Sequence, residues 1–194
     1  MSHAIKLNKT YTYADYMKWN GDERWELIEG VPYNMTPAPM RQHQKLSREI
    51  GYKIMSFLQG KSCEVYFAPF DVRFPSKQSN KTEDSNIDSV VQPDISVICN
   101  KKKLDDRGCI GAPDFIIEII SKSTATIDTR EKFALYEKHG VKEYWIVFPE
   151  EELVQTFILS RKKEYGKPVV YSFEDDIPAK TLKGLIVSLK DFKV

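Results

Sequence analysis

The sequence predicts an α/β fold in which a mixed β-sheet is flanked by helices. Three observations predict it: short runs rich in β-branched and aromatic residues, a long segment with apolar residues at helical spacing, and a strand-helix-strand order through residues 113–148. The chain has 194 residues, of which 41% are hydrophobic and 29% charged. These values are typical of globular proteins and predict a single domain over residues 1–194.

The N-terminal part predicts a short helix, a hairpin and a long helix. Residues 11–20 predict the short helix, and residues 25–35 alternate around Glu29 and Gly30 in the manner of a hairpin. Residues 41–59 predict the long helix, because their apolar side chains recur at helical spacing and define one buried face. The apolar positions are Leu46, Ile50, Ile54, Phe57 and Leu58.

The next part alternates between apolar and polar segments. Residues 63–74 predict a strand region that Pro69 interrupts, and residues 75–89 form a polar loop. Residues 90–99 predict a second strand, and residues 100–111 a charged connection.

The centre of the chain predicts a strand, a helix and a second strand. Residues 113–121 form the first strand, and residues 121–128 are rich in Ser, Thr and Asp, which cap helices well. A helix then follows over residues 129–139 and ends at Gly140, and residues 141–148 return to a strand. Such a unit crosses over right-handed and places the carboxyl ends of its strands at one crevice.

The C-terminal part predicts additional strands. Residues 153–159 read as the hairpin neighbour of the preceding strand, and residues 169–173 and 184–189 read as two more strands. Strand pairs are therefore expected at both ends of the chain, on either side of the central part in which helices and strands alternate.

Charge and hydropathy argue against a protein that binds nucleic acid through its bulk charge and against a membrane-spanning protein. The formal net charge is +1, so any nucleic-acid binding must depend on a local patch rather than on bulk charge. No stretch approaches the roughly 20 apolar residues that span a bilayer. Cys63, Cys99 and Cys109 are odd in number and lack CxxC spacing, which predicts a reducing, cytoplasmic setting and free thiols at Cys99 and Cys109.

Glu118 is a carboxylate inside the strand-forming run FIIEII of residues 115–120. Alternate side chains of a strand share a face, so Ile116, Glu118 and Ile120 point to one side, and both faces around the charge are apolar. A buried carboxylate is costly without a cation, a strong hydrogen-bond donor or a metal ion beside it. A structural salt bridge is the ordinary alternative to a metal site.

Asp94 is the expected partner of Glu118. It stands just before the apolar run 95–99 and 24 residues before Glu118, so two neighbouring strands could bring the carboxylates together. Two carboxylates at a crevice match the oxygen ligands that Mg²⁺ or Mn²⁺ prefer. A turn or strand-entry residue is the competing interpretation of Asp94.

Lys132 follows the Glu118 strand, in the first turn of the expected helix, where the helix dipole disfavours a cation. An ammonium beside a metal could orient the attacking water or stabilise charge on a phosphate. A surface ion pair with Asp128, four residues earlier, would also explain it.

Five segments together resemble the Uma2 family of restriction-endonuclease-like proteins. They are spread over residues 25–147, which is most of the chain, and read WELIEG at 25–30, QPDISVI at 92–98, GAPDFIIEIISKST at 111–124, DTREKFALY at 128–136 and GVKEYWIV at 140–147. The resemblance implies a restriction-endonuclease-like core of the PD-(D/E)xK superfamily, with additional N- and C-terminal strands.

That superfamily uses Asp, Asp or Glu, and Lys around a divalent metal, and the resemblance assigns Asp94 and Glu118 to the acidic positions. Ile120 occupies the usual place of the lysine, two residues after Glu118. The resemblance implies that Lys132 supplies the amine from the following helix, and Lys122 is the competitor.

Two more carboxylates are candidates for the same site. Superfamily members often add an acidic residue from the first helix, which here would be Glu49, although a solvated glutamate is the commoner outcome. Asp71, in the strand region 63–74, could also line the crevice.

The functional hypothesis is an endonuclease that hydrolyses DNA with Mg²⁺, or with Mn²⁺ as a substitute. Asp94 and Glu118 would hold the ion, and Lys132 would assist the attacking water or the transition state. The alternative is an inactive nuclease fold that serves as a DNA-binding or assembly module. A homodimer would suit an enzyme that cuts both strands.

Overall fold

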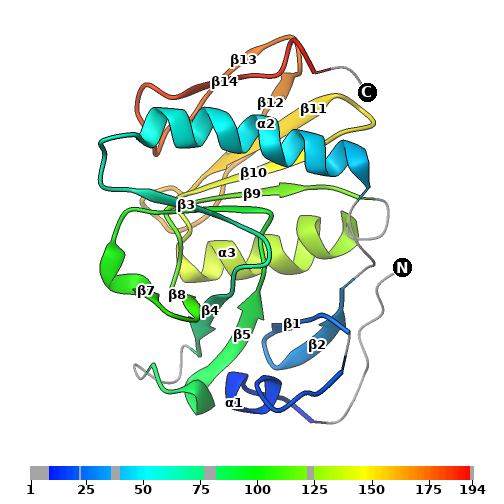
Figure 1. Cartoon of the computed structure of the whole chain (residues 1–194), viewed down its shortest axis with the longest axis vertical. Helices are drawn as coiled ribbons and strands as arrows, with labels where there is room; N and C mark the ends of the chain where they lie inside the picture. Colours follow the sequence, from blue (N-terminus) through cyan, green and yellow to red (C-terminus); the bar gives the residue numbers. More distant parts are fainter. Residues whose placement is uncertain (1–8, 22, 36–39, 77–81, 122–124, 193–194) are drawn as a thin grey trace.

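The computed structural model describes residues 9–21, 23–35, 40–76, 82–121 and 125–192, which form two six-stranded sheets and a two-stranded one (Figure 1). In spatial order the central sheet is β12 (Val169–Ser172), β11 (Leu153–Ile158), β10 (Glu143–Phe148), β9 (Phe115–Ile119), β6 (Ile95–Ile98) and β3 (Glu64–Phe67). The second sheet is β2 (Val31–Asn34), β1 (Trp25–Ile28), β5 (Ile87–Val91), β4 (Val72–Pro75), β8 (Gly108–Ile110) and β7 (Leu104–Asp105). The small sheet pairs β13 (Asp176–Pro178) with β14 (Ile186–Ser188).

Helices cover both faces of the central sheet, as the sequence predicts for a mixed sheet flanked by helices (Figure 1). The α-helices are α1 (Tyr13–Tyr16), α2 (Arg41–Leu58) and α3 (Phe133–His139). Short 3₁₀ helices are η1 (Asp84–Asn86) and η2 (Lys101–Lys103), and η3 (Ile127–Lys132) is a π-helix. The α2 helix lies against one face of the sheet and α3 against the other.

The spacing of apolar residues along α2 and their alternation along β9 explain why a helix packs on each face of the central sheet. Leu46, Ile50, Ile54 and Leu58 of α2 are buried in one core cluster with Ile117 of β9, as their spacing predicts. The adjacent residue of β9, Ile116, lies in a second cluster, on the other face of the sheet and beside α3. The parallel pairing of β9 with β10 and the antiparallel hairpin of β1 with β2 are likewise as expected.

Residues 90–99 do not form the single strand that the sequence predicts. The β5 strand ends at Val91 in the second sheet, and β6 begins at Ile95 in the central sheet. Pro93, which lacks a backbone N–H, lies in the break. The chain therefore changes sheets immediately before Asp94, and the pairing of Ile95 with Ile117 brings Asp94 beside Glu118.

Three short strands arise where the sequence predicts connections. β7 and β8 form a tight hairpin inside the charged segment 100–111, and β13 precedes the last predicted strand. Each has two or three residues, too few to show a two-residue alternation of apolar side chains.

The helix after β9 begins earlier than predicted and is partly of π type. Helical structure is present at residues 125–126, continues through η3 and passes directly into α3. Lys132 therefore lies inside the helical segment and not in its first turn. The predicted end is confirmed, because Gly140 adopts a left-handed conformation with φ of 87°.

The expectation of a free thiol at Cys99 is wrong, because Cys99 forms a disulfide with Cys63. Glu64 of β3 pairs with Ile98 of β6, so the two cysteines stand opposite each other one residue further along. Their separation of 36 residues gave no local signal. The buried Cys109 is a free thiol, as predicted. The disulfide removes the cysteine-based reason for expecting a reducing setting.

Glu143 attaches the C-terminal segment to the central sheet. Its side chain is fully buried and accepts hydrogen bonds from Trp145 Nε1 at 2.8 Å and from the backbone N–H groups of Lys180 at 3.0 Å and Thr181 at 2.6 Å. Three donors thus satisfy one buried carboxylate, so its position in a strand is structural.

We expect Glu143→Ala to lower the free energy of unfolding by about 2 kcal/mol or more, because it leaves three buried donors without an acceptor. Urea denaturation would measure this loss. Glu174→Ala is the matched control, since Glu174 is exposed and its removal is expected to cost less than about 0.5 kcal/mol. Equal stability of the two variants would contradict the structural role of Glu143.

Candidate active site

Glu118 lies in the middle of β9 with only 2% of its surface exposed. Its Oε1 atom accepts hydrogen bonds from Lys132 Nζ at 3.1 Å and from Tyr136 Oη at 2.8 Å. Both donors come from the helical segment that follows β9. The carboxylate that the sequence places in an apolar strand thus has a cation and a hydroxyl donor beside it.

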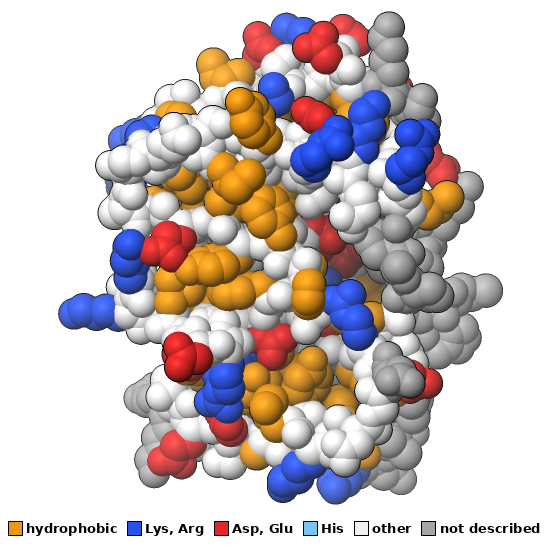
Figure 2. All heavy atoms as spheres, viewed as in Figure 1, with side chains coloured by type: hydrophobic (Ala, Val, Ile, Leu, Met, Phe, Trp, Pro, Cys, Tyr) orange, Lys and Arg blue, Asp and Glu red, His pale blue; other side chains and the backbone are white. Residues whose placement is uncertain are grey.

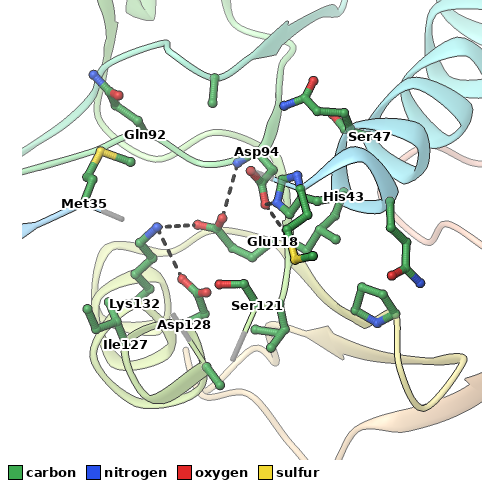
Figure 3. A pocket seen from close by; sticks show the side chains of 18 of the residues that line it. Met35, His43, Ser47, Gln92, Asp94, Glu118, Ser121, Ile127, Asp128 and Lys132 are labelled. Carbon is green, nitrogen blue, oxygen red and sulfur yellow. Dashed lines mark hydrogen bonds and ion pairs between the residues drawn. The ribbon is translucent and has the colours of Figure 1, made fainter. Parts of the chain in front are cut away.

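Asp94 adjoins Glu118 at the start of β6 (Figure 3). Its Oδ2 atom accepts a hydrogen bond from the backbone N–H of Ile119 at 2.7 Å and lies 3.1 Å from His43 Nε2. Its own backbone N–H donates to Glu118 Oε2 at 3.3 Å. The two carboxylates are therefore held side by side, as their predicted placement on neighbouring strands requires.

Lys132 is buried among three carboxylates. Its Nζ atom lies 2.9 Å from Glu26 Oε1, 3.1 Å from Glu118 Oε1 and 3.4 Å from Asp128 Oδ1. The predicted pair with Asp128 exists, but it is buried rather than on the surface, because both residues belong to the π-helix packed under β9. Single turns of π-helix occur frequently at functional sites.

Burial and neighbouring charges both shift the pKa values of Glu118 and Lys132. Burial raises the pKa of Glu118 well above its ordinary value; Lys132 opposes this shift, whereas Asp128 and Asp94 add to it. Burial works against the charge of Lys132, but Glu118, Glu26 and Asp128 hold its pKa well above the usual range. Three carboxylates around a single ammonium group leave this cluster with an excess of negative charge, which attracts an added cation.

His43 completes the cluster from α2. Burial lowers its pKa, but the hydrogen bond to Asp94 and the charge of that carboxylate outweigh burial and raise it. Its position in the sequence, seven residues before Ile50 and at the edge of the buried helix face, favours a packed or capping role for this histidine. It does pack at the edge of α2, and it also orients Asp94 through Nε2.

The cluster opens into a cleft of about 1050 Å³. Asp94, Glu118 and Lys132 all line it, so the three residues predicted to act together are brought together. Its rim is mixed in charge, with Arg24 and Arg48 among the lining residues together with the acidic pair Glu150 and Glu151.

The three additional candidates have different outcomes. Asp71 accepts hydrogen bonds from Tyr13 Oη at 3.1 Å and from Gln92 Nε2 at 2.9 Å, and it is not part of the cleft lining. Glu49 pairs with Arg48 on α2, with its side chain 40% exposed, and it also lies outside the lining. Lys122 lies outside the described residues.

Glu26 and Tyr136 are the residues of the cluster that the sequence did not single out. Glu26 lies in the motif WELIEG, but its contact is with a lysine 106 positions away, which no local pattern reveals. Tyr136 is four residues after Lys132, a spacing that places the two side chains on one side of a helix and could have indicated it.

The described residues contain no group of three or more His, Cys, Asp or Glu side chains arranged to hold a metal ion. Asp94 and Glu118 therefore offer two carboxylate ligands, which backbone carbonyls, water or a phosphate would have to complete. This donor set and the excess negative charge fit a hard divalent cation such as Mg²⁺.

The fold and the site define an α/β protein with a carboxylate-lysine cluster at the floor of a cleft. The sequence model of the Uma2 family, described as "Putative restriction endonuclease", matches residues 13–190. The chain therefore belongs to the Uma2 family, as its motifs predict.

A solved structure from Anabaena variabilis, titled "a putative nuclease belonging to DUF820", is similar with a TM-score of 0.72 and 21% sequence identity. The similarity covers 93% of this chain and 96% of that one, and it confirms the α/β nuclease-like fold. An uncharacterized protein of Synechocystis sp. is 25% identical over 135 residues, which are 69% of this chain and 65% of that protein, just under two thirds of its length.

No helix among the described residues combines the length and the apolar character that crossing a membrane requires.

We expect Lys132→Met to lower the free energy of unfolding by about 3 to 5 kcal/mol, because three buried carboxylates would lose their shared cation. Urea denaturation would measure the change. Lys190→Met is the matched control, since Lys190 forms an exposed ion pair with Asp176 at 3.1 Å and such pairs contribute about 1 kcal/mol or less. A similar loss in both variants would show that the cluster does not depend on its lysine.

Proposed function

We propose that this protein is an endonuclease that hydrolyses phosphodiester bonds of DNA with Mg²⁺, for which Mn²⁺ can substitute. The observation that carries the proposal is the adjacent pair Asp94 and Glu118, with Lys132 on Glu118, at the floor of a large cleft. Membership of a family described as restriction-endonuclease-like supports the same class of reaction.

Asp94 and Glu118 would hold the ion. When bound, it would polarise the phosphate and lower the pKa of a water molecule. His43 Nε2 and the backbone N–H of Ile119 both contact Oδ2 of Asp94 and hold this oxygen in place. Neither contact involves Oδ1, the second oxygen of the same carboxylate. Asp94 thus has an oriented carboxylate at the cleft, as a ligand requires.

Lys132 would orient the attacking water or stabilise charge on the phosphate. Its ammonium is already placed against Glu118, and the adjacent carboxylates keep it protonated. A protonated lysine can donate to a phosphate oxygen or to water, and in a buried site such a bond is stronger than in bulk solvent.

One observation favours the alternative of an inactive DNA-binding or assembly module. An ammonium group has three donors, and Lys132 has three carboxylate neighbours within 3.4 Å. A lysine whose donors are all used by the protein has to release one of them before it can act on a substrate. The alternative predicts DNA binding without cleavage.

We expect purified protein to nick plasmid DNA with Mg²⁺ or Mn²⁺, and Asp94→Asn and Glu118→Gln each to lower the rate by at least roughly 100-fold, because each removes a carboxylate ligand. Lys132→Met retains both carboxylate side chains and should lower the rate to a similar degree, measured at a temperature at which circular dichroism shows the variant to be folded. Gel electrophoresis of nicked and supercoiled plasmid would measure the rates. Glu174→Gln is the matched control on the surface.

Equal nicking by Glu118→Gln and the wild-type protein would reject this assignment of the site. DNA retention with no cleavage in either metal would favour the inactive module.

We also expect Mg²⁺ to raise the unfolding temperature, because an ion that binds only the folded state stabilises it by about 2.7 kcal/mol at 100 times its dissociation constant. For a chain of this size that corresponds to a rise of roughly 5–10 °C. Differential scanning calorimetry would measure it, with KCl of equal ionic strength as the control for screening. A rise that persists unchanged in Glu118→Gln would place the ion elsewhere.

A further inference from the structure

Exposed side chains follow one face of α2. Arg48, Tyr52 and Met55 succeed one another at spacings of four and three residues, so they share a face of the helix. Their exposed fractions are large: 71% for the side chain of Arg48, 64% for Tyr52 and 45% for Met55. This face therefore offers two apolar side chains to solvent, together with an arginine whose ion pair with Glu49, at 2.9 Å, is exposed and so contributes little in water.

This face begins in the cleft. Arg48 and Phe67 of β3 both line the cleft. A Cβ atom at Gly51 would lie 2.3 Å from Cε1 of Phe67, so the aromatic ring rests directly on the α2 backbone, one residue before Tyr52. Arg48, Tyr52 and Met55 thus form one exposed surface, the α2 strip, which runs along the helix from the cleft that Arg48 and the half-buried Phe67 line.

The charge around the cleft favours the binding of a polyanion at the side that α2 forms. In a chain with net charge +1, α2 alone contains four basic residues against the single carboxylate Glu49. The four are Arg41, Lys45, Arg48 and Lys53. Figure 2 shows Lys and Arg side chains gathered over one end of α2, with hydrophobic side chains next to them. The turn after β10 instead contributes Glu150 and Glu151 to the cleft, where they repel phosphate.

The apolar side chains of the strip favour an unpaired nucleic-acid strand over a duplex. In a continuous duplex the bases are stacked on one another and expose only their edges in the grooves. Unpaired bases offer their faces, on which aromatic side chains stack with little sequence preference. A strip that combines an arginine with the exposed ring of Tyr52 and the apolar side chain of Met55 therefore matches an unpaired strand better than a duplex.

We propose that the α2 strip binds an unpaired strand of the substrate, so that the substrate class is DNA with a single-stranded segment beside the cleavage point. This inference rests on the proposed function for the identity of the nucleic acid. Arg48 binds a phosphate, and Tyr52 stacks on a base that has left the cleft.

Fluorescence anisotropy in EDTA tests the strip separately from catalysis. One labelled oligonucleotide is used as a single strand, as a blunt duplex and as a duplex with a single-stranded tail. We expect the single strand and the tailed duplex to bind at least about 10-fold more tightly than the blunt duplex, because stacking contributes at each unpaired base.

Tyr52→Ala should raise the dissociation constant for the single strand and the tailed duplex roughly 5- to 150-fold, since stacking contributes about 1–3 kcal/mol per base. It should change duplex binding less than about 2-fold. Tyr52→Phe retains the ring and should bind as the wild-type protein does, whereas Tyr52→Leu retains only apolar surface and should behave as Tyr52→Ala. Arg48→Ala should reduce the salt dependence of single-strand binding by about 0.7 in the log-log slope.

Two matched controls lie away from the strip. Val170→Ala removes an exposed apolar side chain of β12, and Arg161→Ala removes an exposed arginine after β11. Both should bind all three oligonucleotides as the wild-type protein does, and circular dichroism confirms that every variant is folded.

Equal binding of single strand and blunt duplex, or a Tyr52→Ala variant that binds as Val170→Ala does, overturns the inference. The outcome is distinguishable from that of the nuclease proposal. Tyr52-dependent binding without any metal-dependent cleavage rejects the nuclease and retains the strip. Cleavage with Tyr52-independent binding rejects the strip and retains the nuclease.

Discussion

The structure of the site depends on one interaction, the burial of the Glu118 carboxylate against Lys132. A charge inside an apolar strand requires a donor on the same face, and the helical segment after β9 supplies two, Lys132 and Tyr136. The same ammonium group also forms ion pairs with Glu26 of β1 and Asp128 of the π-helix. One ion pair thus joins the second sheet, the central sheet and the helix at the floor of the cleft.

The sequence predicts the parts of this arrangement that are local. The period of apolar residues identifies α2, Gly140 ends α3, and the run around Glu118 identifies a buried strand. The pairing of Asp94 with Glu118 also follows, because β6 and β9 are neighbours and the carboxylates stand at matching positions. Lys132 required the family resemblance, since its role as part of a buried cluster depends on residues distant in sequence.

The parts that the sequence could not predict depend on tertiary contacts. Glu26 contacts Lys132 because β1 and β5 pair in the second sheet. The division into two sheets coincides with the break at Pro93, and the apolar runs on both sides of that break led to the expectation of one strand. The disulfide of Cys63 with Cys99 requires the register of β3 on β6. The π-helix widens one turn without any proline or glycine within it. Apart from Pro93, which marks the break between the sheets, none of these features has a signature within a window of a few residues.

The distances around Lys132 indicate how its ammonium group, which already contacts three carboxylates, could still bind a phosphate oxygen during the reaction. The three contacts of Nζ are unequal: 2.9 Å to Glu26, 3.1 Å to Glu118 and 3.4 Å to Asp128. Because a contact of 3.4 Å is near the limit of a hydrogen bond, the Asp128 contact costs least to release. We infer that a phosphate oxygen would replace Asp128 and leave Glu26 to hold the ammonium in place. Asp128→Asn should then preserve nicking while Glu26→Gln lowers it, and the reverse order would contradict this exchange.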